Sequence, residues 1–332
     1  MRRTICTLKK TCRGALPRLA TLAVALLLTA LFSARSRAQE KGQKTYPSAE
    51  AASAALFMAL EADSEKALLD VLGQDAKPII STGNVSEDSE RHAEFVRRYL
   101  EMHRLVNEPD GTTTVYIGAE NWPVPIPIVQ KAGVWYFDTD AAKQEILFRR
   151  IGHNELSAIR VCQELVAAQK EYAAEHNNVY AAKIASDADQ QNGLYWPVNG
   201  EKHESPIGPL VAEASVGDGA GSAPSGSNAP LPFHGYFFRV LTRQGKDAPG
   251  GAADYIVNGK MTGGFAFLAY PAEYRETGVT IFIVGQDGVV YQKNLGEKTA
   301  ELATAIKEYD PDSTWEKAEE QSEQTVSDQK AK

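Results

Sequence analysis

The stretch that decides the fold is residues 154–175, NELSAIRVCQELVAAQKEYAAE. Its apolar side chains recur every three or four residues, so they fall on one side of a helix. These residues are Leu156, Ile159, Cys162, Leu165, Val166, Tyr172 and Ala173. At 1.5 Å per residue such a helix would be roughly 33 Å long, as long as a small domain is wide. The helix therefore needs a sheet to lie on.

That sheet is predicted downstream of the helix. Strands are expected at residues 236–241, 264–269, 280–284 and 289–291, with a hairpin signal at Asp287-Gly288 and a short closing helix at 298–308. A stretch dense in Gly, Pro, Ser and Ala, residues 205–232, predicts a mobile loop. The pattern indicates an α+β domain at 151–315, in which the long helix packs on an antiparallel sheet, followed by a disordered tail at 316–332.

The N-terminal half predicts a second α+β domain at residues 46–150, preceded by a disordered segment at 39–45. Ser48 and Ser64 have the character of helix N-caps, and a third helix is expected at 93–103 after a polar connector at 83–91. Strands are expected at 112–117 and 134–137. Prolines alternate with aliphatic residues at 124–129, which favours an edge strand or an extended cover.

Residues 1–38 predict a cleavable signal peptide. Six basic residues and no acidic one precede an apolar run at 19–32, and Ser36-Arg37-Ala38 resembles a cleavage site. The run is short for a bilayer span, although a retained anchor helix is the alternative. We therefore expect a periplasmic or secreted protein with no membrane span after cleavage.

The charge of the mature chain argues against nucleic-acid partners. Past residue 38 the sequence holds 27 basic and 43 acidic residues, a net charge of −16. Such an excess of carboxylates repels phosphate backbones and anionic lipids. Only Cys162 of the three cysteines lies in the mature chain, so no intramolecular disulfide is expected.

Three motifs resemble the bacterial domain-of-unknown-function family 2950. They are WPVPIPIV at 122–129, GVWYFD at 133–138 and RRIGHNEL at 149–156. The likeness runs from about Tyr46 to Trp315, and it implies an exported bacterial protein without an established activity. The C-terminal half also resembles the soluble domains of pilins and pseudopilins, and the N-terminal half has a cystatin-like or NTF2-like pattern.

The candidate binding or junction residues are Arg149, Arg150, His153, Asn154, Glu155, Trp122 and Trp196. We expect Asn154 to cap the second part of an interrupted helix, with the break at Gly152, and the basic–polar string to fix the domain junction. Residues two apart on a helix point to different sides, so His153 and Glu155 are not expected to form a catalytic dyad. Trp122 and Trp196 are candidates for stacking on sugars, with core anchoring as the alternative.

No catalytic, metal or cofactor site is predicted, because the sequence lacks the usual zinc spacings and nucleophile elbows. The first hypothesis is a non-enzymatic envelope protein that binds a protein or glycan partner. A periplasmic hydrolase or hydrolase inhibitor acting through the junction residues is one alternative. A pseudopilin-like assembly factor is the other.

Overall fold

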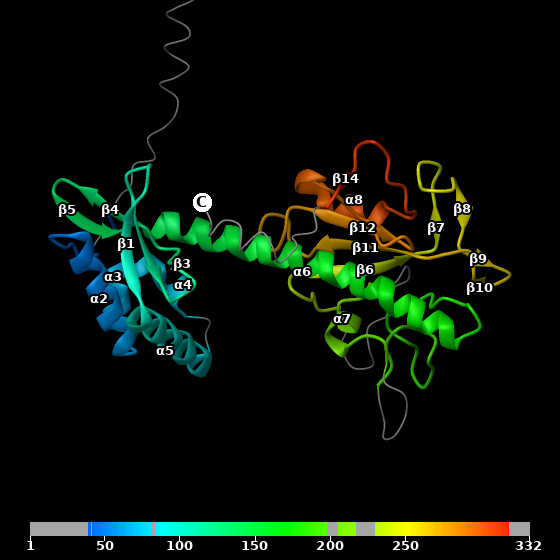
Figure 1. Cartoon of the computed structure of the whole chain (residues 1–332), viewed down its shortest axis with the longest axis horizontal. Coiled ribbons are helices and arrows are strands. Elements are labelled where there is room, and N and C mark those ends of the chain that lie inside the picture. Colours follow the sequence, from blue (N-terminus) through cyan, green and yellow to red (C-terminus); the bar gives the residue numbers. More distant parts are fainter. Residues whose placement is uncertain (1–38, 41, 82–83, 198–204, 217–229, 319–332) are drawn as a thin grey trace, which may run out of the picture. The chain divides into compact units, whose positions relative to one another are not determined.

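The computed structural model describes residues 39–40, 42–81, 84–197, 205–216 and 230–318 (Figure 1). The predicted signal peptide lies outside these residues, as do residues 217–229 of the predicted mobile loop and the predicted tail beyond residue 318. The chain divides into two compact units, residues 1–142 and 143–332, called here the N-terminal unit and the C-terminal unit. Both combine helices with antiparallel sheet, which confirms the α+β class.

Helices open the N-terminal unit. Ser48 and Ser64 cap the first two by accepting hydrogen bonds from the amides of Ala51 and Ala67, as their sequence positions predict. The helical segments are α2 (Ala49–Glu61), α3 (Glu65–Leu72), the 3₁₀ turn η1 (Gln74–Ala76), α4 (Lys77–Ile80) and α5 (Val85–Glu101). The expected polar connector at 83–91 is wrong from Val85 onward, because Asn84 accepts a hydrogen bond from the Ser86 amide and starts α5.

The sheet of this unit has the order β1-β2-β4-β5, with β3 also paired to β2. Its strands are β1 (His103–Asn107), β2 (Thr113–Ile117), β3 (Trp122–Pro123), β4 (Ile128–Lys131) and β5 (Val134–Phe137). Of the two alternatives predicted for 124–129, an edge strand or an extended cover, the edge strand is wrong. Strand β4 starts at Ile128, just after the last proline, and lies between β2 and β5. Proline has no amide hydrogen to donate, so the paired segment begins where the prolines end.

A hydrophobic core joins these helices to the sheet. Its members include Leu56, Leu68, Tyr99, Ile117 and Phe137, all buried. The predicted disordered segment 39–45 is partly wrong. Gln43 is buried and its Nε2 donates to the carbonyls of Val71, Leu72 and Phe137, so three backbone acceptors tie this residue to the core.

The long helix α6 spans Thr139–Glu175 without a break, so the predicted interruption at Gly152 is wrong. A single glycine inside a helix costs about 1 kcal/mol relative to alanine, which neighbouring contacts can offset. The boundary between the two units falls inside α6, between Ala142 and Lys143, whereas the sequence placed it at residue 150.

The main sheet of the C-terminal unit has the order β14-β13-β12-β11-β6, antiparallel throughout. Its strands are β6 (Tyr236–Leu241), β11 (Ala266–Pro271), β12 (Ile281–Gly285), β13 (Val290–Lys293) and β14 (Glu316–Lys317). The first four confirm the predicted strands within two residues. The predicted disorder is wrong at Glu316 and Lys317, because these residues pair with β13.

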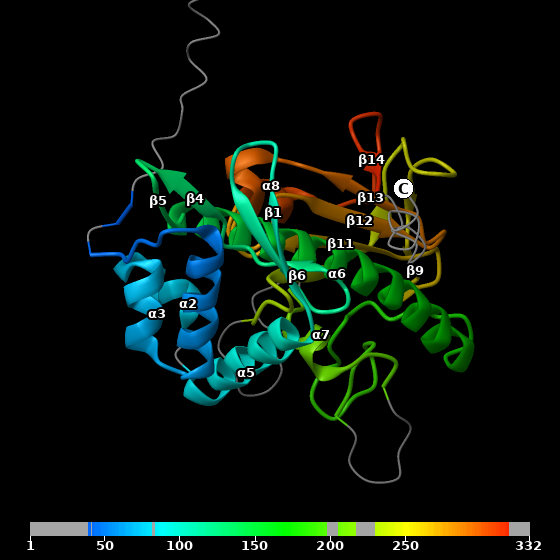
Figure 2. The ribbon, with the colours of Figure 1, turned by 60° about the vertical axis from the view of Figure 1, so that its left-hand side comes forward.

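Helices cover both faces of this sheet. Alternate residues of a strand point to opposite faces. Phe238 belongs to the core that contains Cys162 and Leu165 of α6, whereas the next residue, Arg239, reaches α8 (Thr299–Ala305). Helix α6 runs along the sheet in both views (Figures 1 and 2). The result is a helix–sheet–helix arrangement around one core.

Smaller elements complete the unit. They are α7 (Pro209–Glu213), the 3₁₀ turn η2 (Gly296–Lys298), and two short strand pairs, β7 (Arg243–Gln244) with β8 (Ala253–Asp254) and β9 (Ile256–Val257) with β10 (Lys260–Met261). The mobile-loop prediction is wrong for residues 209–216, because they form α7 and a bridge from Ser215 to Phe238 of β6. Among the described residues, no helix has the length and apolar content needed to cross a bilayer.

Candidate functional site

The basic–polar string at 149–156 holds the connection between β11 and β12. Asn154 is only 8% exposed, and its Nδ2 donates a hydrogen bond of 2.9 Å to the carbonyl of Thr277. The prediction that Asn154 caps a helix is therefore wrong, because α6 continues through it. The side-chain amide of Asn154 instead donates to the backbone carbonyl of Thr277, in the loop between β11 and β12 of the same unit.

Glu155 also binds the backbone of the β11–β12 connection. Its Oε1 accepts hydrogen bonds from the amides of Val279, at 2.9 Å, and Thr280, at 3.1 Å. The hydroxyl of Tyr236 donates to the carbonyl of Thr280 at 2.8 Å, which brings the start of β6 to the same loop. Burial raises the pKa of Tyr236 above its ordinary value, and the nearby Glu155 carboxylate raises it further. This phenol therefore stays protonated and acts as a donor.

The two arginines of the string form ion pairs. Arg149 Nε lies 2.7 Å from Glu145 Oε1, one helical turn earlier, and Arg150 Nη2 lies 3.4 Å from Glu276 Oε2. Arg150 and Glu276 are both more than half exposed, and such surface pairs contribute about 0–1 kcal/mol. Glu276 belongs to the same β11–β12 connection, so Arg150 adds a third contact to it.

His153 makes a different contact from its neighbours. Its ring lies edge-on to the ring of His234, with 5.6 Å between the ring centroids and 83° between the planes. Both histidines are exposed. The structure thus directs the His153 ring to His234 and the Glu155 carboxylate to backbone amides. His153 and Glu155, the two residues that a catalytic dyad would need, therefore contact different segments of the chain.

The two candidate tryptophans differ in exposure. Trp196 is 5% exposed and belongs to the core of the C-terminal unit, so its faces are covered by protein. Trp122 lies in β3 of the N-terminal unit and is 37% exposed. Trp122 is therefore the candidate whose ring a sugar can reach.

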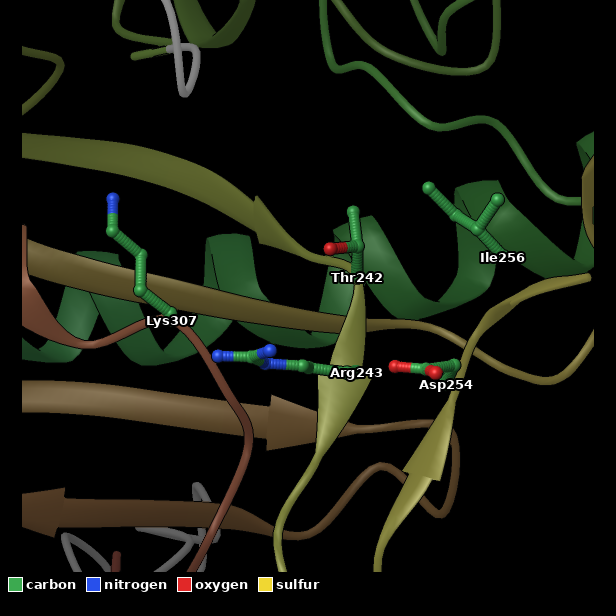
Figure 3. A pocket seen from close by; sticks show the side chains of 5 residues that line it. All are labelled: Thr242, Arg243, Asp254, Ile256 and Lys307. Carbon is green, nitrogen blue, oxygen red and sulfur yellow. The ribbon is translucent and has the colours of Figure 1, made fainter. Parts of the chain in front are cut away.

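A shallow, open pocket of about 370 Å³ lies at one end of the main sheet of the C-terminal unit. Figure 3 shows its lining, Thr242, Arg243, Asp254, Ile256 and Lys307. Arg243 and Asp254 occupy opposite positions in the β7–β8 pair, and Arg243 Nε lies 3.5 Å from Glu308 Oε2. The lining combines charges of both signs with aliphatic surface.

The backbone around this pocket is well anchored. The Tyr309 amide donates to the Arg243 carbonyl, and the Gly245 amide donates to the Tyr309 carbonyl. Gln244, next to Arg243, is buried, and its Nε2 donates to the carbonyls of Pro249 and Gly251. The pocket residues thus project from a fixed edge of the fold.

Beside the pocket, Ile256 and Val257 form β9 and remain 44% and 46% exposed. None of the pocket residues was singled out in the sequence, because they are ordinary surface residues scattered from 242 to 307. His234 was not among the candidate residues either. Within the described ranges, no group of three or more His, Cys, Asp or Glu side chains is placed to hold a metal ion.

Comparison with known proteins identifies the family and no closer relative. Neither a search of curated proteins nor a search of solved structures finds a match. The pilin-like and cystatin-like likenesses therefore stay predictions from pattern. Residues 43–318 match the family described as "Protein of unknown function (DUF2950)", which covers most of the chain and includes the RRIGHNEL string. The chain belongs to the DUF2950 family.

Proposed function

We propose that the mature chain is an exported, non-enzymatic binding module of the cell envelope, and that it holds a protein partner at the pocket end of the C-terminal sheet. Export is supported by residues 1–38, in which basic residues are followed by an apolar run and then by a cleavage-site-like sequence of small residues. The non-enzymatic part is supported by the contacts of the junction string, since Asn154 and Glu155 serve the backbone of the β11–β12 connection.

The pocket end carries the binding part of the proposal. Ile256 and Val257 expose aliphatic surface next to Arg243, Asp254 and Lys307. A patch of apolar side chains rimmed by charged ones is typical of protein–protein contact surfaces. The lining contains no aromatic ring on which a sugar could stack, so a protein partner suits this surface better than a glycan.

The test compares two double variants of the mature chain. Ile256→Asp with Val257→Asp places charge on the proposed surface. Leu210→Asp with Leu231→Asp introduces the same charges at two exposed aliphatic residues elsewhere in the same unit, each 58% exposed. Each immobilised protein is incubated with envelope extract, and bound proteins are identified by mass spectrometry. Binding to the purified candidate partner is then measured by calorimetry.

We expect the wild type and the leucine variant to capture the same partner with the same affinity, and the β9 variant to lose it. Circular dichroism and melting must show that all three proteins are folded. Equal affinity of the β9 variant for the partner would refute the surface. Loss in the leucine variant alone would move the contact to the region of α7.

A further inference from the structure

His153 and His234 approach each other on the surface of the C-terminal unit, although 80 residues separate them in the chain. Their ring centroids are 5.6 Å apart. An ion bonded to one nitrogen of each ring at about 2.0–2.1 Å needs ring centres roughly 5–6 Å apart. The terminal torsion of a histidine side chain is broad, so exposed rings can turn a nitrogen toward the space between them.

The backbone holds His234 in this position at a conformational cost. His234 has a φ of +46° and Gly235 a φ of +72°, and the amides and carbonyls of Phe233 and Tyr236 bond to each other across them. These values describe a type I′ turn, in which Asn, Asp and Gly are favoured. A positive φ is uncommon for a residue other than glycine, although histidine adopts it more often than most. The turn geometry therefore fixes where the His234 side chain leaves the backbone.

The turn is also packed tightly against α6 and the β11–β12 connection. A Cβ added to Gly235 would lie 2.6 Å from Thr277 Cβ and 2.8 Å from Asn154 Nδ2. The Phe233 ring lies 4.3 Å from the His234 ring, centroid to centroid. Since Asn154 holds Thr277 through a hydrogen bond, the helix, the turn and the loop form one rigid support for the two imidazoles.

The charges around the pair are balanced. Arg150, one turn before His153, is paired with Glu276, and Arg149 is paired with Glu145. A cation bound between the rings would therefore meet ion pairs rather than uncompensated positive charge. Imidazole is a preferred ligand for zinc, copper and nickel, whereas calcium and magnesium select oxygen.

We propose that His153 and His234 form a surface site for a divalent transition-metal ion, with Zn²⁺ as the probe. Two imidazole nitrogens would bind the ion, and water would occupy the remaining positions of its coordination sphere. This site is separate from the proposed partner surface at β9, so an experiment that refutes one of the two proposals leaves the other unaffected. An ion held here would join α6 to the turn before β6, so it would also stabilise the fold by mass action.

The test is zinc titration of the mature chain against a chromophoric chelator. The variants are His153→Gln and His234→Asn, the second chosen because asparagine tolerates a positive φ. His176→Gln is the control, since His176 lies just past the end of the same helix and its ring stacks on Tyr172. We expect one saturable site in the wild type and the control, weakened by about tenfold or more in each single variant.

A second readout is the melting temperature with and without zinc. Zinc should raise it in the wild type and in His176→Gln, and should leave it unchanged in His153→Gln and His234→Asn. Absence of saturable zinc binding in the wild type would overturn the site. Equal binding by the wild type and the two variants would overturn it as well, because the ion would then be held elsewhere.

Discussion

The side chain of Asn154 donates a hydrogen bond to the backbone carbonyl of Thr277 from the middle of α6. Through this contact α6 supports a loop between two strands of the C-terminal sheet. Asn154→Ala leaves the partly buried Thr277 carbonyl without this donor, so we expect a loss of about 0.5–1.5 kcal/mol in the free energy of unfolding. Urea unfolding of a protein that comprises residues 39–332 measures this loss.

Glu164→Ala is the matched control for Asn154→Ala, because Glu164 is exposed on the same helix. A surface change of this kind is expected to stay within about 0.5 kcal/mol. Glu155→Ala should behave like Asn154→Ala, since it removes the acceptor of two amides. A variant at Glu155 that kept its stability but lost a hydrolytic activity of the wild type would support the hydrolase alternative instead.

The second prediction concerns the start of the N-terminal unit. A chain that begins at Tyr46, the predicted domain boundary, lacks the Gln43 amide that donates to Val71, Leu72 and Phe137. We expect this truncated chain to unfold at lower urea concentration than one that begins at Gln39, with a loss of about 1–3 kcal/mol. Gln43→Ala in the longer chain should reproduce most of the loss. Identical midpoints for all three proteins would contradict it.

The third prediction concerns a buried cation. Arg239 is 4% exposed, and its guanidinium donates to the carbonyls of Ala303, Thr304 and Ile306 at the end of α8. A positive charge there also interacts favourably with the helix dipole. Arg239→Met keeps much of the volume but removes the donors, so we expect a loss of about 2–3 kcal/mol in the free energy of unfolding. Arg160→Met, exposed on α6, serves as the control.

The fourth prediction follows from the buried thiol. Cys162 is fully buried, and burial raises its pKa to about 12 from an ordinary value of 9.0. Above pH 9 the unfolded chain loses this proton while the folded chain keeps it, so the thiol's contribution to stability falls as pH rises from about 9 to 12. The stability difference between the wild type and Cys162→Ala should therefore shrink over that range. A thiol reagent should label Cys162 only after unfolding.

Some features of this protein follow from local patterns in the sequence. Serines at 48 and 64 start helices because their side chains accept amides of the first turn, and that requires only a few neighbouring residues. The amphipathic run at 154–175 and the strands near 236, 266, 281 and 290 are likewise visible from spacing. Two cores, one in each unit, follow from the distribution of these elements.

Other features depend on residues far apart in the chain. The role of Asn154 changed from a helix cap to a support for Thr277, because the partner lies 123 residues away and no local spacing shows it. Strand β1 was missed because the apolar spacing of the preceding helix continues to His103, whose ring stacks on Tyr99, and only the partner strand β2 makes it a strand. Gln43 and Glu316 were assigned to disorder since their own neighbours are polar.

The sequence by itself determined the α+β class, the acidic character and the main elements, since each depends on composition or on periodicity within a short window. The family followed from the resemblance of three motifs to its members and from the match over residues 43–318. Only the tertiary structure decided that α6 is continuous, that the junction string supports the β11–β12 connection, and that the ring of His153 lies against the ring of His234. Hydrogen bonds and ring contacts across long separations fix these features, and a one-dimensional pattern carries no record of which distant residues become neighbours.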